Sequence, residues 1–376
     1  MITILAFGAW VLTGLSAAAG DVASPAVEKA LEAWEKSDRH VGVEQLSAWS
    51  EAIRGETPRG DAEVLARLLA LAGDDSRVRL SPHAALRLAC ELADDVGTRQ
   101  ILDFLRPHLE TAAKGFRGVP PSEADKVRVA KGFLRTFVMY GAEALMSTTE
   151  NQEPVTEFLT AVCIRGGQEP KLDSVCARLI AECELPLARR QEAALEIVEK
   201  KWKRGAPEEV LLELLGLFDE TTLPRLRHLV RDGDAWDTFH YGAADVLSYL
   251  ADKEIVADLE AWRPVLRAEH VNLEEYVRRC IWRIEVQSPA TKLLDYIEGV
   301  EHAPYYESRF WAVRRADALG VPHERIREAI LEHARRCRKE GTSSPLVELK
   351  WTGLQLGILK DDDMPEVQIP PTTVTE

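Results

Sequence analysis

The sequence predicts an all-α protein in which antiparallel helix pairs stack into an α-solenoid. Beyond the first 20 residues, apolar side chains recur at spacings of three and four, and no stretch alternates with period two long enough to form a strand. Proline and glycine divide the chain into segments of ordinary helix length. Two separate stretches also share the spacing of their turn and helix residues, which indicates an internal repeat.

The composition fits a folded chain that does not bind nucleic acid. Its 376 residues exceed the usual length of one compact domain, but a solenoid grows by adding units. The hydrophobic share of 46% is ordinary for a well-packed protein. The 62 acidic and 47 basic residues give a net charge of -15, which repels phosphate backbones. The one arginine-rich run, residues 325–339, is interleaved with glutamates and is interpreted as a solvated helix face.

Residues 1–19 have the pattern of a signal peptide. They carry no charged side chain, residues 4–15 form an apolar core, and Ala17, Ala18 and Ala19 are small enough for a signal peptidase. The pattern predicts export to the periplasm or the extracellular space. Because the apolar run approaches the ~18 residues that can span a bilayer, an uncleaved N-terminal membrane anchor is the alternative.

The first helices are expected at Ala30 to Trp34, Val43 to Ile53 and Val64 to Leu71, where apolar residues follow helical spacing. The Ser81-Pro82 pair predicts another helix start, with the serine oxygen as the cap and the proline at the first helical position. Further helices are expected between the later proline and glycine breaks. Residues 361–376 lack this periodicity and are predicted to be a disordered tail rich in Asp and Pro.

Residues 223–259 contain a whole repeat unit and the start of the next. A short apolar helix, a charged turn at 232–234 and a second helix ending near Leu250 are expected before a turn at Ala251-Asp252. The triplet at 250–252 also occurs at 92–94, and residues 262–266 match 105–109 in the position of their Arg-Pro pair.

This pattern resembles the HEAT-like repeats of bacterial proteins. Leu223, Leu226 and Leu229 match the first helix of such a repeat, and Ala243 and Ala244 match the paired alanines of the second. The resemblance implies an α-helical repeat domain over residues 20–360, with an extended surface that binds a protein or peptide. The arginine usual early in the second helix is absent, and residues 237–240 stand in its place.

Two groups of residues are candidates for binding. Asp232, Asp234, Asp237 and His240 crowd one turn, but their spacing is not that of a calcium loop and Asp234 is expected to be a helix cap, so no metal is predicted. His240 and Tyr241 remain as candidate binding residues. Tyr305 and Tyr306 are a second aromatic candidate, with packing between repeats as the alternative.

No catalytic residue or cofactor is predicted. The sequence has no GxSxG, HExxH, Walker or GxGxxG motif. Cys163 lies near Gly166-Gly167 but has no histidine partner that the sequence reveals. The six cysteines are scattered and are expected to be buried thiols, although bridges between neighbouring helices stay open: Cys90, Cys163, Cys176, Cys183, Cys280 and Cys337.

Three functions are therefore considered. The first is a non-catalytic scaffold that binds a protein or peptide partner outside the cytoplasm. The second is an exported enzyme with an α/α-toroid fold that acts on polysaccharide with a pair of carboxylates. The third is a structural component tethered to the membrane, which requires that residues 1–19 remain uncleaved.

Overall fold

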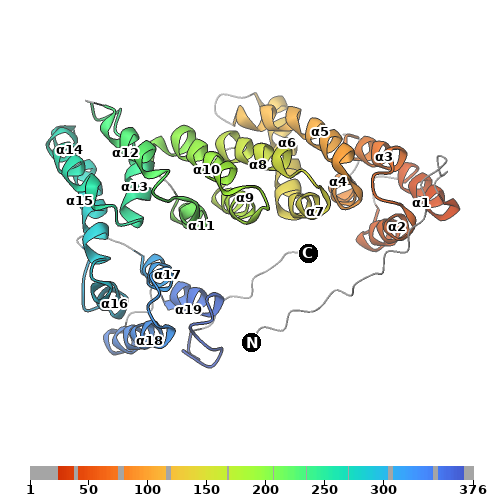
Figure 1. Ribbon diagram of the computed structural model, residues 1–376. Helices are drawn as coiled ribbons and strands as arrows, with labels where there is room; N and C mark the ends of the chain where they lie inside the picture. The colour runs from red at the N-terminus through yellow and green to blue at the C-terminus, as the bar shows by residue number, and fades with distance from the viewer. Residues whose placement is uncertain are drawn as a thin grey trace. The chain divides into compact units, whose positions relative to one another are not determined.

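The computed structural model is all-helical, and the residues that it describes contain no strand (Figure 1). The chain divides into two compact units, Met1–Gly97 and Thr98–Glu376. No helix in the described ranges has both the length and the apolar character needed to cross a bilayer. The expected signal peptide lies outside those ranges, which are 24–37, 41–74, 80–115, 120–166, 169–205, 207–233, 235–269, 271–303, 308–341 and 346–367.

The first unit contains the helices expected near its start. They are α1 (Pro25–Glu35), α2 (Val43–Glu56), α3 (Ala62–Ala72) and α4 (Leu80–Leu92). Helix α1 packs on α2, α3 packs on α4, and α2 also contacts α4. The carboxylate of Asp61 accepts hydrogen bonds from the backbone N–H groups of Glu63 and Val64 and so caps α3.

Ser81 has a different role from the cap that the sequence predicts. Helix α4 begins at Leu80, so Ser81 lies within its first turn. Its hydroxyl oxygen accepts a hydrogen bond of 2.7 Å from the indole Nε1 of Trp34 in α1. Both side chains are buried, so this bond is a link between α1 and α4 inside the unit. A donor 47 positions away in the sequence therefore uses the oxygen that was expected to cap the helix.

The second unit is also a succession of helices with short 3₁₀ or π-helical segments. Helix α5 (Asp95–Ala113) crosses the boundary between the units. The others are α6 (Pro121–Thr136), η1 (Phe137–Gly141), α7 (Ala142–Thr148), α8 (Glu153–Arg165), α9 (Pro170–Glu182), α10 (Leu187–Lys201), η2 (Trp202–Arg204), α11 (Glu208–Leu214), η3 (Leu215–Leu217), α12 (Leu223–Arg231), α13 (Tyr241–Tyr249), η4 (Lys253–Ile255), α14 (Val256–Glu269), α15 (Val271–Val286), α16 (Ala290–Glu298), α17 (Phe310–Ala318), α18 (His323–Glu340) and α19 (Leu346–Gln355).

Several helices of the second unit contact the helix two places further along the chain, and some of them also contact the next helix. Helix α8 packs on α9 and α10, and α9 also packs on α11. The same relation links α12 with α13 and α14, and α13 with α15. Later in the chain, α16 contacts α17 and α18, and α17 contacts α19. Within each of these groups, alternate helices such as α8 and α10 therefore lie side by side in one row, and successive helices lie in different rows.

The stretch 223–259 forms the three successive helices that its sequence predicts, α12, α13 and the start of α14. Ala251 has a left-handed φ of 58°, and the carboxylate of Asp252 accepts a hydrogen bond of 3.1 Å from the backbone N–H of Glu254. The guanidinium of Arg227 in α12 makes two further hydrogen bonds, of 2.7 and 2.9 Å, to that carboxylate. Asp252 therefore ends one turn and also ties α12 to the start of η4.

The matching triplet in the first unit has the same cap. Asp94 accepts hydrogen bonds of 3.0 and 2.8 Å from the backbone N–H groups of Val96 and Gly97. Helices α5 and α14, which follow the two triplets, each contain an internal proline, Pro107 and Pro264. The shared sequence pattern thus corresponds to shared local structure.

Overpacking of α13 should destabilise the second unit. Ala244 is fully buried on this helix, which packs against α12, α15 and η2. We expect Ala244→Leu to lower the free energy of unfolding by about 1–3 kcal/mol, because the added methyl groups force neighbouring side chains out of their rotamers. Denaturant unfolding measures this difference. Ala257→Leu on the exposed face of α14 is the matched control, and equal unfolding midpoints for the two variants would contradict the packing assigned to Ala244.

The last described residues are ordered, unlike the disordered tail predicted from residue 361. Asp363 is only 8% exposed and accepts a hydrogen bond of 2.9 Å from Nε of Arg327 in α18. The buried ammonium of Lys350 in α19 donates to the carbonyls of Met364 and Val367, both at 3.0 Å. Residues 361–367 therefore pack against α18 and α19, and the rest of the expected tail lies outside the described ranges.

Candidate functional site

His240 caps a helix inside the second unit. It is 5% exposed, and its Nδ1 accepts a hydrogen bond of 3.2 Å from the backbone N–H of Ala243, in the first turn of α13. Its Nε2 lies 3.5 Å from the carbonyl oxygen of Glu199. Burial lowers the pKa of the imidazole. His240 is therefore the N-terminal cap of α13, a role that the sequence analysis had given to Asp234.

Tyr241 is part of an aromatic cluster. Its ring meets those of Phe239 and Tyr276 edge to face, with centroids 4.7 and 4.9 Å apart. The Tyr276 hydroxyl donates a hydrogen bond of 3.0 Å to the Tyr241 carbonyl oxygen. The structure thus brings His240 and Tyr241 together at the start of α13, where both pack against neighbouring elements. Tyr305 and Tyr306 lie outside the described residues.

The aspartates near His240 do not converge with it. Asp232 and Asp237 are exposed, whereas the His240 side chain is buried, and Asp234 lies outside the described residues. Within the described ranges, no group of three His, Cys, Asp or Glu side chains is placed to hold a metal ion.

All six cysteines are buried, and none of them forms a disulfide with another cysteine. Cys163 donates from Sγ to the carbonyl oxygen of Asp173, 3.8 Å away, and so faces α9 and not the Gly166 loop. Burial raises the pKa of the Cys176 thiol well above its ordinary value, and the neighbouring Cys163 acts in the same direction. Such thiols are poor nucleophiles because the reactive thiolate is disfavoured.

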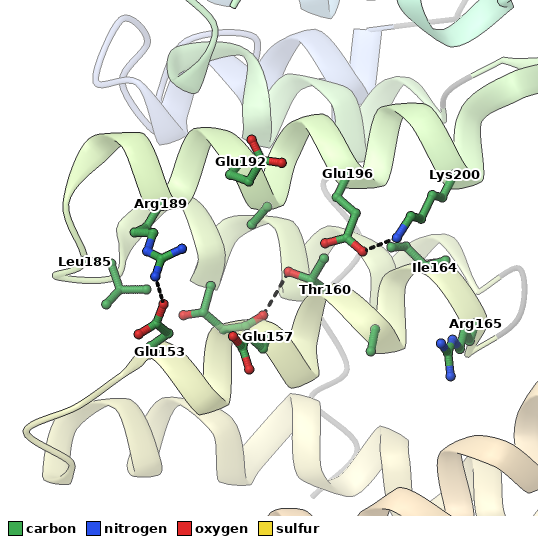
Figure 2. A pocket seen from close by; sticks show the side chains of 13 residues that line it. Glu153, Glu157, Thr160, Ile164, Arg165, Leu185, Arg189, Glu192, Glu196 and Lys200 are labelled. Carbon is green, nitrogen blue, oxygen red and sulfur yellow. Dashed lines mark hydrogen bonds and ion pairs between the residues drawn. The ribbon is translucent and has the colours of Figure 1, made fainter.

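A groove of about 350 Å³ lies between α8 and α10, in the same row of helices (Figure 2). Thr156, Thr160, Ala161 and Ala193 are small side chains, so the two helices leave space between them. Thr160 is only 3% exposed and donates a hydrogen bond of 2.9 Å to the Thr156 carbonyl oxygen. The remaining side chains of the lining are Glu153, Glu157, Ile164, Arg165, Leu185, Arg189, Glu192, Glu196 and Lys200.

Ion pairs occupy most of the charged groups at the groove. Figure 2 shows Arg189 of α10 against Glu153 of α8, at 2.7 Å, and Lys200 against Glu196, at 2.6 Å. Glu192 accepts from Arg225 of α12, at 2.9 Å. Arg165 pairs with Glu110 at 2.9 Å. The exposed carboxylate of Glu157 has no ion pair or hydrogen bond to any residue in the described ranges.

A second hollow, of about 240 Å³, lies between α12 and α14. Its charged side chains are Arg231 and Asp258, which form an ion pair of 2.8 Å with each other. Trp262 lines the same hollow and donates from Nε1 to the Val230 carbonyl oxygen, 2.8 Å away. Its charged groups are therefore paired, and the groove between α8 and α10 is the stronger candidate for binding.

A buried polar network joins α13, α15 and α17, and the sequence reading missed it. Arg283 donates to the carboxylate of Asp245 at 2.8 Å, and its guanidinium carbon lies 4.3 Å from the ring centre of Tyr249. Gln287 donates to the Ser248 carbonyl oxygen at 2.9 Å and accepts from Arg315 at 2.7 Å. The sequence feature that could have indicated this network is the pair of polar residues Asp245 and Ser248, three positions apart in the otherwise apolar segment 243–250.

No protein-family model matches the sequence, and no curated protein or solved structure matches the chain. The assignment of function therefore depends on the geometry of the groove. Small side chains form its floor, and charged residues of α8 and α10 line its walls. One of its carboxylates, that of Glu157, has no partner in the described part of the chain.

Proposed function

We propose that this chain is a non-catalytic scaffold of HEAT-like helical repeats that binds a protein or peptide partner at the groove between α8 and α10. The repeat architecture is supported by the contacts of α8, α12 and α16 with the next two helices, which a stack of helix pairs would produce. The similar caps at Asp94 and Asp252 add to this support. The groove itself is the observation that carries the proposed binding function.

The groove suits a partner segment with a lysine or arginine side chain. Such a side chain would lay its apolar stem over Ala161 and Ile164 and place its cation beside Glu157. Glu157 can accept a charge-assisted hydrogen bond without breaking an ion pair, since it has none within the described ranges. The net charge of -15 would also attract a basic segment toward the chain.

The same ion pairs favour binding over hydrolysis. Glycoside hydrolysis uses two carboxyl groups, one as acid and one as base or nucleophile. At this groove Glu153 and Glu196 each contact a cation, and Glu192 contacts Arg225. Export through residues 1–19, with a retained membrane anchor as the alternative, remains part of the proposal.

We expect Glu157→Arg to weaken the binding of basic peptides by about tenfold or more, because it removes the acceptor and adds a repelling charge. An array of synthetic peptides that differ only in the number of lysine and arginine residues provides the probe. Fluorescence anisotropy then measures the Kd of the peptides that bind. Ala161→Trp should weaken the same peptides by filling the groove without changing its charge.

Glu220→Arg is the matched control, because Glu220 is exposed in the turn before α12 and does not line the groove. It changes the net charge of the chain equally and should leave the Kd within a factor of about two, since an exposed distant charge is screened by salt. Equal weakening by Glu157→Arg and Glu220→Arg would mean that the peptides respond only to the overall charge.

A further inference from the structure

A thiol and an imidazole face each other on α18. His333 and Cys337 are one helical turn apart, and Nε2 of the histidine lies 3.4 Å from Sγ of the cysteine. The two residues are only 6% and 4% exposed. The sulfur and the nitrogen are therefore shielded from water, and the four-residue spacing on α18 keeps them close together.

The end of α16 holds the imidazole in place. Gly299 has a left-handed φ of 87°, and a Cβ atom there would lie 2.9 Å from Nδ1 of His333. The absence of a side chain thus lets the ring pack against the backbone, with Nε2 directed toward Cys337. In the tautomer with the proton on Nδ1, the Nε2 lone pair of the neutral imidazole faces the Cys337 sulfur, 3.4 Å away.

The surroundings favour a ligand of low charge. Arg336 beside this site is engaged by Glu298 at 2.8 Å, and Arg309 donates to the Tyr296 carbonyl oxygen at 3.0 Å. Within the described ranges no third His, Cys, Asp or Glu completes a metal-binding group. Tetrahedral zinc, which takes four ligands, is therefore a poor fit. A thiolate with a monovalent cation is neutral overall, and burial of a neutral pair costs less than burial of a net charge.

We propose that His333 and Cys337 form a two-coordinate site for a soft monovalent cation of the Cu(I) or Ag(I) class. Thiolate sulfur and imidazole nitrogen are ligands that Cu(I) accepts. On binding, the thiol proton passes to solvent, and one metal–sulfur and one metal–nitrogen bond form. If these bonds resemble those of zinc, at about 2.3 and 2.0 Å, a linear site separates the two atoms by about 4.3 Å. The sulfur and the nitrogen are now 3.4 Å apart, so they must move apart by about 0.9 Å when the ion binds.

The pair Cys163 and Cys176 is the main competitor for the same ion, because two thiols in one core can also bind Cu(I). The test therefore uses the full chain carrying Cys163→Ala and Cys176→Ala, alongside the unaltered full chain. Cu(I) is titrated without oxygen against a chromophoric Cu(I) chelator, with circular dichroism as the check of folding.

We expect the Cys163→Ala, Cys176→Ala protein to bind one equivalent of Cu(I), with X-ray absorption showing one sulfur and one nitrogen neighbour. In the Cys163→Ala, Cys176→Ala protein, Cys337→Ser and His333→Gln should each weaken Cu(I) binding by at least about tenfold. Cys90→Ser, which removes another buried thiol, is the matched control and should leave the affinity unchanged.

Absence of Cu(I) binding would overturn the proposal, and so would binding that the Cys163→Ala, Cys176→Ala change abolishes. If Cys337→Ser or His333→Gln does not fold, the X-ray absorption spectrum of the Cys163→Ala, Cys176→Ala protein decides. A sulfur-only environment there contradicts the site, and a mixed sulfur and nitrogen environment supports it.

Discussion

Replacing Asp245 with alanine is expected to lower the free energy of unfolding of the second unit by about 3–5 kcal/mol. Asp245 and Arg283 are both buried, and their ion pair of 2.8 Å links α13 to α15. Removal of the carboxylate leaves the guanidinium without its counter-charge in a region where water cannot replace it. Chemical denaturation followed by circular dichroism measures the loss.

The double change Asp245→Leu with Arg283→Met separates the penalty of a stranded charge from the value of the pair. Because it removes both charges and retains apolar volume, we expect it to recover most of the lost stability. Arg128→Ala is the control for an exposed pair, since Arg128 and Asp125 are 59% and 72% exposed and should contribute less than about 1 kcal/mol. A double variant as unstable as Asp245→Ala would show that the network stabilises through its geometry and not through charge balance.

Trp34→Ala should destabilise the first unit by about 3–5 kcal/mol. Trp34 is completely buried in α1, so its removal leaves a large cavity, and the Ser81 hydroxyl also loses its indole donor. Amide hydrogen exchange with mass spectrometry is the suitable measurement, because the two units need not unfold together. Peptides from α1 and α4 should exchange faster, whereas those from α15 serve as an internal reference.

Trp34→Phe separates the two contributions. The phenyl ring keeps most of the buried volume but cannot donate to Ser81, so we expect a loss nearer 1–2 kcal/mol, of the order of about one buried hydrogen bond and a partial cavity. If Trp34→Ala leaves the protection of α1 and α4 unchanged, the indole is not part of the core that holds these helices together.

Local patterns were sufficient to predict the helices. The period of apolar residues and the turn residues between 223 and 259 predicted α12, α13 and the start of α14, and the structure confirms them. The repeated Leu-Ala-Asp triplet also corresponds to a repeated cap. Such features depend on residues within about one or two helical turns, so a single sequence contains the needed information.

Ser81 and the residues after 360 show where prediction from neighbouring residues fails. A serine before a proline is a good candidate for a helix cap, but the Ser81 hydroxyl accepts from Trp34 across the core. The residues after 360 are polar and were predicted to be disordered, but Arg327 and Lys350 hold residues 361–367 against α18 and α19. In both cases a partner more than ten positions away supplies the interaction.

The periodicity of the chain thus established its all-helical class, its main breaks and its candidate repeat, because those properties arise from neighbours along the chain. The groove at Glu157, the buried Asp245–Arg283 pair and the contact of His333 with the backbone of Gly299 arise where separate helices meet. Their burial and distances depend on how helices pack, and side-chain spacing in one helix does not encode the face that a second helix presents to it.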